Sequence, residues 1–222
     1  MNYAIAIDGP AAAGKSTVAK LLAKKLNITY IDTGAMYRAF TYYVLSKKLD
    51  PKDEAVCSQL IDEVLIQLMP NNIVLCNGID VTKAIREQTV TDHVSFIASY
   101  KSIRLSLVEM QRKLAKKVSV VMDGRDIGTY VLPEANVKIY QIASIETRAV
   151  RRYEENLAKG IACTLDQVEE DLRRRDYIDS HRDFAPLRPA EDSILLDTSF
   201  MTVDQAVQKI LEIIQKKLGI QS

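Results

Sequence analysis

The chain has 222 residues, which is enough for one sizeable domain or for one domain with insertions. Its hydrophobic fraction of 47% suits a globular core, and its formal net charge of +1 gives no electrostatic reason to expect nucleic-acid or membrane binding. No signal-peptide pattern and no apolar run of about 18 residues occur, and the three cysteines (Cys57, Cys76, Cys163) lack metal-type spacing and fit a reducing compartment. We therefore expect a cytoplasmic protein with no membrane span.

The first informative segment follows an apolar, strand-like run at residues 3–7. It precedes apolar residues at helical spacing, so the pattern G-x-x-x-x-G-K-[ST] lies between a strand and a helix, as a P-loop requires. Successive backbone N–H groups of such a loop cradle phosphate. Lys15 can then reach the β- and γ-phosphates, and the Ser16 hydroxyl can ligate Mg²⁺. A simple glycine- and alanine-rich turn is disfavoured, because all three fixed residue types occur in place. The loop consists of Gly9, Pro10, Ala11, Ala12, Ala13, Gly14, Lys15, Ser16 and Thr17.

Strand and helix patterns alternate along the rest of the chain, which predicts a parallel sheet covered on both faces. A segment at about 62–86 breaks this alternation with short apolar runs around Pro70-Asn71-Asn72 and Asn77-Gly78, which predicts a small antiparallel meander; an irregular excursion is the alternative. We expect strands at 4–7, 28–31, 118–122, 137–142 and 194–196, and helices at about 14–26, 34–47, 88–98, 100–116, 145–159, 165–182 and 203–218.

Polar residues follow three of the predicted strands. The P-loop follows the first, Asp32-Thr33-Gly34-Ala35-Met36-Tyr37-Arg38 follows the second, and Asp123-Gly124-Arg125-Asp126-Ile127-Gly128 follows the third. Ligands of open α/β sheets bind outside the carboxyl ends of the strands, so these segments should converge on one cleft. We expect Thr33 at a helix N-cap. Arg38 is either a site residue or a solvated helix arginine, and Asp123 could act on Mg²⁺ through water.

Arginines are concentrated between residues 148 and 188. Arg148, Arg151 and Arg152 lie three and four residues apart on one predicted helix, and Arg175, Asp179 and Arg182 share a face of the next. A helix hairpin with arginines on both arms suits a mobile lid that closes over phosphates. Arg173 and Arg174 fit a solvated face equally well, and the isolated His93 and His181 fit structural or surface positions.

The combination of motifs resembles the bacterial cytidylate kinases, a family of P-loop nucleoside monophosphate kinases. The resemblance covers about residues 3–217 and rests on the P-loop, D-T-G-A-M-Y-R, D-G-R-D-I-G, V-K-I-Y with A-S-I-E-T-R-A-V-R-R, and R-R-D-x-x-D-x-x-R before A-P-L. The meander at 62–86 also resembles the insertion that enlarges the monophosphate-binding region in this family.

The resemblance implies a role for each matching position. Residues 9–17 would bind the ATP phosphates, with Lys15 on the transferred group and Arg148, Arg151 and Arg152 in the lid. Ser95, Arg104 and Asp126 would read the cytosine edge, while Arg175 and Asp179 would contact the sugar or the phosphate. Lys15, Arg38, Arg125 and Arg182 would be catalytic, the three arginines on the acceptor phosphate. The implied CMP site comprises Thr33, Tyr37, Arg38, Ser95, Arg104, Gly124, Arg125, Asp126, Arg175, Asp179 and Arg182.

Departures from the family pattern are modest. Many members have glycine at Ala12 and serine at Thr33, where threonine keeps the hydroxyl. Tyr177 and Ile178 stand where charged residues are common, so one lid or sugar contact is in doubt.

The resemblance implies a P-loop NTPase three-layer sandwich with a parallel five-stranded sheet, a small antiparallel insertion and a helical lid. We expect one domain over 1–222, with a core at about 1–32, 117–147 and 190–222, a monophosphate-binding region at about 33–116 and a lid at about 148–185. The expected activity is Mg²⁺-dependent phosphoryl transfer from ATP to CMP and dCMP. The expected molecule is a monomer that binds small nucleotides, with no nucleic-acid or membrane partner.

Two alternatives remain at this point. The first is a P-loop kinase of another small acceptor, such as UMP or a non-nucleotide metabolite. Kinases of adenylate, shikimate or dephospho-coenzyme A should lack both D-G-R-D-x-G and the Ser95/Arg104 pair. A nucleotide-dependent switch would need a guanine-reading N-K-x-D, which this sequence lacks.

Overall fold

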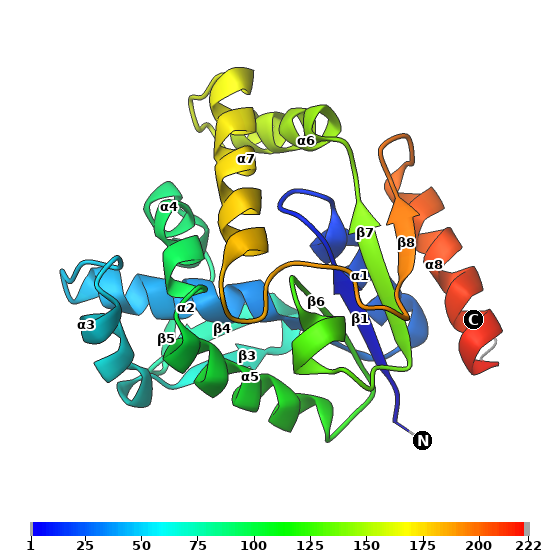
Figure 1. The fold of residues 1–222 in the computed structure, drawn as a ribbon, viewed down its shortest axis with the longest axis horizontal. Coiled ribbons are helices and arrows are strands. Elements are labelled where there is room, and N and C mark those ends of the chain that lie inside the picture. The colour runs from blue at the N-terminus through cyan, green and yellow to red at the C-terminus, as the bar shows by residue number, and fades with distance from the viewer. Residues whose placement is uncertain (1, 220–222) are drawn as a thin grey trace.

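The computed structural model describes residues 2–219 and has a parallel five-stranded sheet at its centre (Figure 1). The strand order is β2-β6-β1-β7-β8, and every neighbouring pair is parallel. All five expected strands are confirmed, with shifts of one or two residues at some ends. The strands are β1 (Ala4–Asp8), β2 (Thr29–Asp32), β6 (Val120–Gly124), β7 (Val137–Ile142) and β8 (Ile194–Asp197).

Both faces of this sheet are covered, as the alternation of strand and helix predicts. On one face, α1 (Lys15–Leu26) and α8 (Val203–Leu218) pack on alternate residues of β1, Ile5 and Ile7. On the other face, Ala6 packs with residues of α5 (Lys101–Ala115) and of a π-helical turn at Ile127–Val131. The central strands β1 and β6 are buried on both faces, which explains why residues 4–7 and 120–122 are apolar runs rather than alternating patterns.

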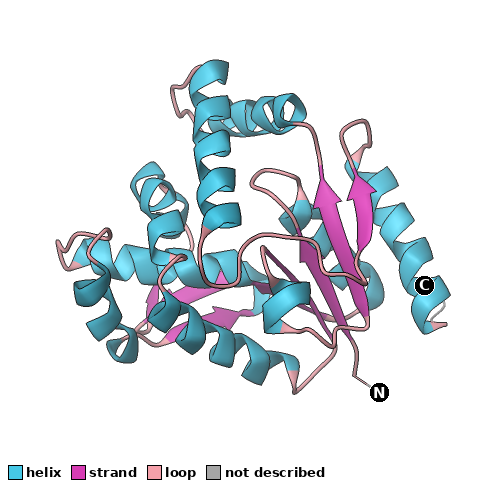
Figure 2. Cartoon of the chain, in the orientation of Figure 1, coloured by secondary structure: helices cyan, strands magenta, loops and turns pink. Residues whose placement is uncertain are grey.

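The chain between β2 and β6 forms a second region with its own apolar core. Its small antiparallel sheet, order β3-β4-β5, confirms the expected meander and lies apart from the main sheet (Figure 2). Asn77 and Gly78, both at positive φ (49° and 79°), make the tight turn between β4 and β5, as an Asn-Gly hairpin requires. The short α3 was not expected from the sequence. The region contains α2 (Thr33–Ser46), α3 (Glu54–Gln59), β3 (Ile66–Met69), β4 (Ile73–Cys76), β5 (Ile79–Asp80), α4 (Gln88–Ile97), α5, and short 3₁₀ turns at Ile61–Glu63, Pro70–Asn72 and Ala84–Arg86.

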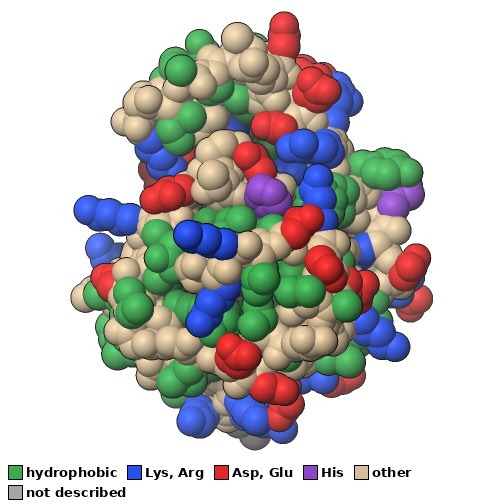
Figure 3. Space-filling model, turned by 90° about the vertical axis from the view of Figure 1, so that its left-hand side faces the viewer, with side chains coloured by type: hydrophobic (Ala, Val, Ile, Leu, Met, Phe, Trp, Pro, Cys, Tyr) green, Lys and Arg blue, Asp and Glu red, His purple; other side chains and the backbone are tan. Residues whose placement is uncertain are grey.

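A helix hairpin follows β7 and stands over the carboxyl end of the sheet (Figure 1). It consists of α6 (Ile145–Ala158) and α7 (Leu165–His181), which pack on each other. The Thr164 hydroxyl and the Gln167 side chain form the capping box that starts α7, and Thr202 and Gln205 do the same for α8. In the space-filling view the hairpin forms an upper lobe, and charged side chains gather at the waist between this lobe and the body (Figure 3).

Candidate active site

One cleft lies at the carboxyl end of the main sheet, beneath the hairpin, with a volume of about 560 Å³. This is the size of a small-molecule site. Its walls include parts of the chain that are distant in sequence: the P-loop, the start of α2, the α4–α5 region, the loop after β6, and both helices of the hairpin, α6 and α7. The three strand ends therefore converge, as the sequence predicts.

The P-loop connects β1 to α1 through backbone that glycine makes possible. A Cβ at Gly9 would lie 2.0 Å from the Gln141 carbonyl oxygen, so no other residue fits there. Gly14 has φ 89° and caps α1 without a side chain, which leaves the first N–H groups of the helix available to an anion. Ala12 also has positive φ, 57°, a conformation that costs a non-glycine residue about 1–2 kcal/mol. Its position is therefore one that glycine would suit.

Lys15 is buried at the base of this loop, where its ammonium donates a 2.7 Å hydrogen bond to the Pro10 carbonyl oxygen. Burial, reinforced by the positive charge of Arg125, lowers the pKa of Lys15 to about 7, although Asp123 and Asp8 act in the opposite direction. A cation destabilised in this way gains most when a phosphate arrives beside it.

Oxygen ligands suited to a hard cation lie next to the P-loop. The Ser16 hydroxyl donates to Asp123 Oδ2 (2.6 Å), and the Tyr30 hydroxyl donates to Asp123 Oδ1 (2.8 Å). Burial, with the nearby Asp32 carboxylate, raises the pKa of Asp123. A metal cation bound here, in addition to the Lys15 ammonium, would compensate the buried negative charge of Asp123. Within residues 2–219 no cluster of three or more His, Cys, Asp or Glu side chains could hold a metal alone. The donor set therefore fits Mg²⁺, which keeps several water and phosphate ligands.

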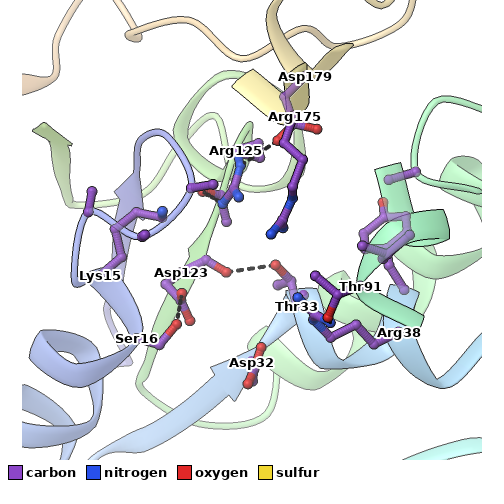
Figure 4. A pocket seen from close by; sticks show the side chains of 18 of the residues that line it. Lys15, Ser16, Asp32, Thr33, Arg38, Thr91, Asp123, Arg125, Arg175 and Asp179 are labelled. Carbon is purple, nitrogen blue, oxygen red and sulfur yellow. Dashed lines mark hydrogen bonds and ion pairs between the residues drawn. The ribbon is translucent and has the colours of Figure 1, made fainter. Parts of the chain in front are cut away.

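Cations without a matching acid gather on the opposite wall of the cleft (Figure 4). Arg38 is buried and donates to Thr91 Oγ1 (2.8 Å) and to the Ile85 carbonyl oxygen (3.3 Å), which are both uncharged. Burial, and then repulsion by Arg175 and Arg86, holds its pKa well below the ordinary value. Arg175 extends from α7 into the pocket, and burial followed by Arg125 lowers its pKa to about 10. Its Nε has no hydrogen-bond partner within the described residues. These groups form a site for an anion such as phosphate.

The third part of the cleft contains a buried charge cluster. Asp126 accepts a hydrogen bond from the Arg104 guanidinium and another from Arg182 Nη2 at 3.3 Å. Arg104 is only 1% exposed, donates to the Ala98 carbonyl oxygen, and lies over the Tyr37 ring at 5.4 Å. Ser95 of α4 lies on the same wall. A carboxylate beside a guanidinium presents an acceptor and donors to a planar ligand edge.

The structure brings together most of the residues that the sequence analysis singled out, but it corrects the expected start of one helix. The N-cap of α2 is Asp32, whose carboxylate accepts from the Ala35 N–H (2.8 Å); the expected N-cap, Thr33, is instead the first helical residue. The Thr33 hydroxyl donates to the Asp123 carbonyl oxygen at 2.6 Å. Arg125 Nε pairs with Asp179 Oδ2 at 2.7 Å, which joins the β6 loop to α7.

The three arginines of α6 do not act as one set. Arg151 and Arg152 line the cleft, and Arg151 also donates to the Thr198 carbonyl oxygen. Arg148 instead directs its guanidinium at the P-loop backbone and at Asp176. Spacings of three and four residues place all three arginines on one side of the helix, so the sequence could not distinguish these side-chain orientations.

Sequence reasoning gave no role to Asp8, the last residue of β1. Its buried carboxylate accepts from the backbone N–H groups of Ile127 (2.8 Å) and Gly128 (2.7 Å), and burial raises its pKa to about 7. Asp8 thereby fixes the loop that carries Asp126 to the strand that leads into the P-loop. Its place directly before the P-loop, at a strand end, was the only available signal.

A P-loop on a parallel sheet, a facing pocket of uncompensated arginines and a helix hairpin above them define a P-loop phosphotransferase of small molecules. The family model described as cytidylate kinase matches residues 5–216. The chain therefore belongs to the cytidylate kinase family.

Relatives agree with this membership, and a solved structure shares the fold. The chain is 50% identical over 221 residues to a cytidylate kinase of Geobacillus sp. (strain WCH70), covering 98% of this chain and 99% of that one. It is 51% identical over 217 residues to a cytidylate kinase of Bacillus licheniformis, covering 96% of both chains. A solved structure of an uncharacterized protein from Eubacterium ventriosum shares the fold, with a TM-score of 0.54 and 16% identity over 96% of this chain and 99% of that one. No helix within residues 2–219 is long and apolar enough to cross a membrane.

Proposed function

We propose that the chain transfers the γ-phosphoryl group of ATP to CMP and dCMP, giving ADP with CDP or dCDP. The observation that carries this proposal is the buried Arg104–Asp126 pair, which shares one cleft with the P-loop and with the unpaired Arg38 and Arg175. Family membership and relatives that bear the name cytidylate kinase support the same acceptor.

The donor half of the proposed mechanism uses residues 9–17, with Arg151 and Arg152 from the lid. Lys15 supplies positive charge to the transferring group, and its lowered pKa reflects a charge that the phosphates would stabilise. Mg²⁺ would bind between the phosphates, the Ser16 hydroxyl and, through water, Asp123; when bound, it would neutralise charge on the phosphate oxygens. Arg148 also belongs to this half, and it contacts the P-loop through the Ala11 carbonyl oxygen.

The acceptor half binds CMP by its two ends. Arg38, Arg125 and Arg182 hold the phosphate together with Arg175, assisted by Thr33, Gly124 and Asp179, which line the same cleft. The acceptor is itself a phosphate, so the reaction needs positioning and charge neutralisation rather than a strong general base. Asp126 accepts from the cytosine amine while Arg104 donates to the ring nitrogen and carbonyl, with Ser95 as a third contact.

The rest of the proposal concerns the molecule as a whole. A single catalytic unit with a core, a monophosphate-binding region and a lid acts as a cytoplasmic monomer. Its partners are small nucleotides, and no feature of its charge suggests nucleic acid.

The test is product formation from ATP and Mg²⁺ with CMP, dCMP, UMP, AMP and shikimate as separate acceptors. We expect CDP and dCDP to form with kcat/KM well above that for every other acceptor. A higher kcat/KM for another acceptor would refute the cytosine assignment. Release of inorganic phosphate from ATP without phosphorylation of any acceptor would refute the kinase assignment.

A further inference from the structure

Ala11, in the middle of the P-loop, is held by the lid on both sides of its peptide group. The Ala11 N–H donates to Asp176 Oδ1 at 3.0 Å, and the Ala11 carbonyl oxygen accepts from Arg148 Nη1 at 3.1 Å. The P-loop N–H at this position is therefore directed at a carboxylate of α7. Ala11 therefore lies at the interface between loop and lid as well as lining the cleft.

The two lid side chains are also joined to each other, and they come from different arms of the hairpin. Arg148 of α6 pairs with Asp176 of α7 at 2.5 Å, and Arg148 Nε donates to the Ala143 carbonyl oxygen at 3.0 Å. Both side chains are largely buried, at 9% and 21% exposed. Because charge-assisted bonds are stronger when they are buried, this pair fixes the arms relative to each other and to Ala11.

An apolar contact supports the same docking point independently of charge. The Ala11 side chain, 2% exposed, packs in a cluster with Ala149 of α6 and with Val168 and Leu172 of α7. A methyl group on the P-loop thus sits in the core of the lid hairpin. The alanine that stands at this position gives the loop an apolar face that the lid covers.

We propose that Asp176 is a positioning residue for phosphoryl transfer: with Arg148 it clamps the Ala11 peptide and fixes the lid on the P-loop in the closed arrangement. This rests on the proposed kinase function. Asp176 directly follows Arg175 and lies one helical turn before Asp179, so its attachment sets the position of the site residues of α7. Arg148 does the same for Arg151 and Arg152 of α6.

The consequence is selection against water. A lid that docks on the P-loop backbone closes the cleft in one fixed register, and closure is what keeps ATP from reacting with water instead of the acceptor. Loss of the clamp should leave nucleotide binding largely intact and allow a larger share of ATP to be hydrolysed.

Asp176 also lies close enough to Lys15 to favour its charged form, so an electrostatic role has to be separated from the clamp. The electrostatic role and the clamp predict different effects on ATP binding and on the products. Removing a negative charge beside the triphosphate site should by itself strengthen ATP binding and leave the products unchanged. Loss of the clamp should change the products, and Asp176→Glu, which keeps the charge but shifts the carboxylate by one methylene, should fail in the same way as Asp176→Asn.

The experiment compares the full-length protein with Asp176→Asn, Asp176→Glu and the matched control Asp171→Asn, an exposed acid of the same helix that pairs with Arg174. Each protein is supplied with ATP, Mg²⁺ and saturating CMP, and the CDP and inorganic phosphate that it forms are both measured. We expect both Asp176 variants to raise the phosphate:CDP ratio by roughly threefold or more, with the control unchanged. An unchanged ratio in Asp176→Asn, or a normal ratio in Asp176→Glu, overturns the proposal.

A second measurement needs no variant and no activity. By NMR, the Ala11 amide of the unmodified protein should exchange with solvent far more slowly than a free loop amide, because it is bonded to Asp176 and buried. Exchange at the rate of an exposed amide overturns the clamp. Failure of the unmodified protein to form CDP would refute the proposed function instead, and the exchange result would still decide the clamp.

Discussion

Replacing Asp126 by asparagine tests the base-reading pair most directly. Arg104 and Arg182 bond to different oxygens of Asp126, so the amide of the Asp126→Asn variant would keep an acceptor for only one of them and would place an N–H donor where the other carboxylate oxygen lies. Cytosine offers an amine donor at that edge and uracil offers a carbonyl acceptor, so the substitution reverses the match for both bases. The side chain is 6% exposed, so water cannot repair the mismatch.

The size of the effect follows from this burial. A buried donor that faces another donor costs about 1–3 kcal/mol, which is the cost for cytosine in the variant. Uracil regains part of this free energy, because its carbonyl oxygen can accept from the new N–H group. We therefore expect the ratio of kcat/KM for CMP over UMP to fall by about one to two orders of magnitude. Asp126→Ala, which removes the acceptor and supplies no donor, should also reduce kcat/KM for CMP far more than for UMP.

The assay has to separate specificity from stability. Asp126 compensates two buried guanidinium groups, and breaking such a cluster destabilises a protein by about 3–5 kcal/mol. Melting curves therefore accompany the initial rates with CMP, dCMP and UMP, all taken well below the melting temperature, and Asp171→Asn serves as the control. An equal loss of kcat/KM for CMP and UMP in a folded variant would show that Asp126 serves the phosphate site or the fold, and not the base.

Three further predictions concern the donor site and the lid. Lys15→Ala should lower kcat by about 10²-fold or more in a folded protein, and near-normal turnover would remove Lys15 from the mechanism. In the free protein the pKa of Lys15 is lowered to about 7, and bound phosphates would raise it. ATP binding at pH 8 should therefore be accompanied by uptake of nearly one proton. This uptake should fade below pH 6, where Lys15 is already charged before ATP binds. Calorimetry in two buffers of different ionisation enthalpy measures the uptake, Lys15→Ala should abolish it, and heats that do not depend on the buffer at pH 8 would contradict it. Hydrogen exchange in 148–182 should slow when a bisubstrate analogue binds, since the analogue suppresses the lid openings that the contact with Ala11 alone still permits, and equal protection in both states would argue against a moving lid.

The sequence predicted the parts of this structure that depend on local pattern. Apolar runs placed the five strands, and the P-loop and the two loops after β2 and β6 were correctly placed at one edge of the sheet because parallel strands end together. The capping boxes at Thr164 and Thr202 gave the starts of two helices. These signals act within a few residues, so a single sequence contains them in full.

What the sequence missed depends on partners far along the chain. Ser16 bonds to Asp123, 107 residues away, and Ala11 bonds to Asp176, 165 residues away. Helical spacing placed Arg148 with Arg151 and Arg152, but only tertiary packing decides that Arg148 turns to the P-loop while the others line the cleft. The Asp32 cap of α2 was missed because both Asp32 and Thr33 are good N-cap residues, and the difference lies in where β2 ends.

The net charge of +1 conceals a local excess of buried positive charge in the cleft. Lys15, Arg38 and Arg175 are buried at an electrostatic disadvantage, as their lowered pKa values show, and no acid within the described residues offsets Arg38 directly. Two nucleotides bring the negative charge that these groups lack. Charge alone, however, would accept water as readily as a second phosphate, because it stabilises the transferring group whatever attacks it. Selectivity for the acceptor has to come from closure in a fixed register, and the contact of the lid with the Ala11 backbone supplies a register that does not depend on the phosphates.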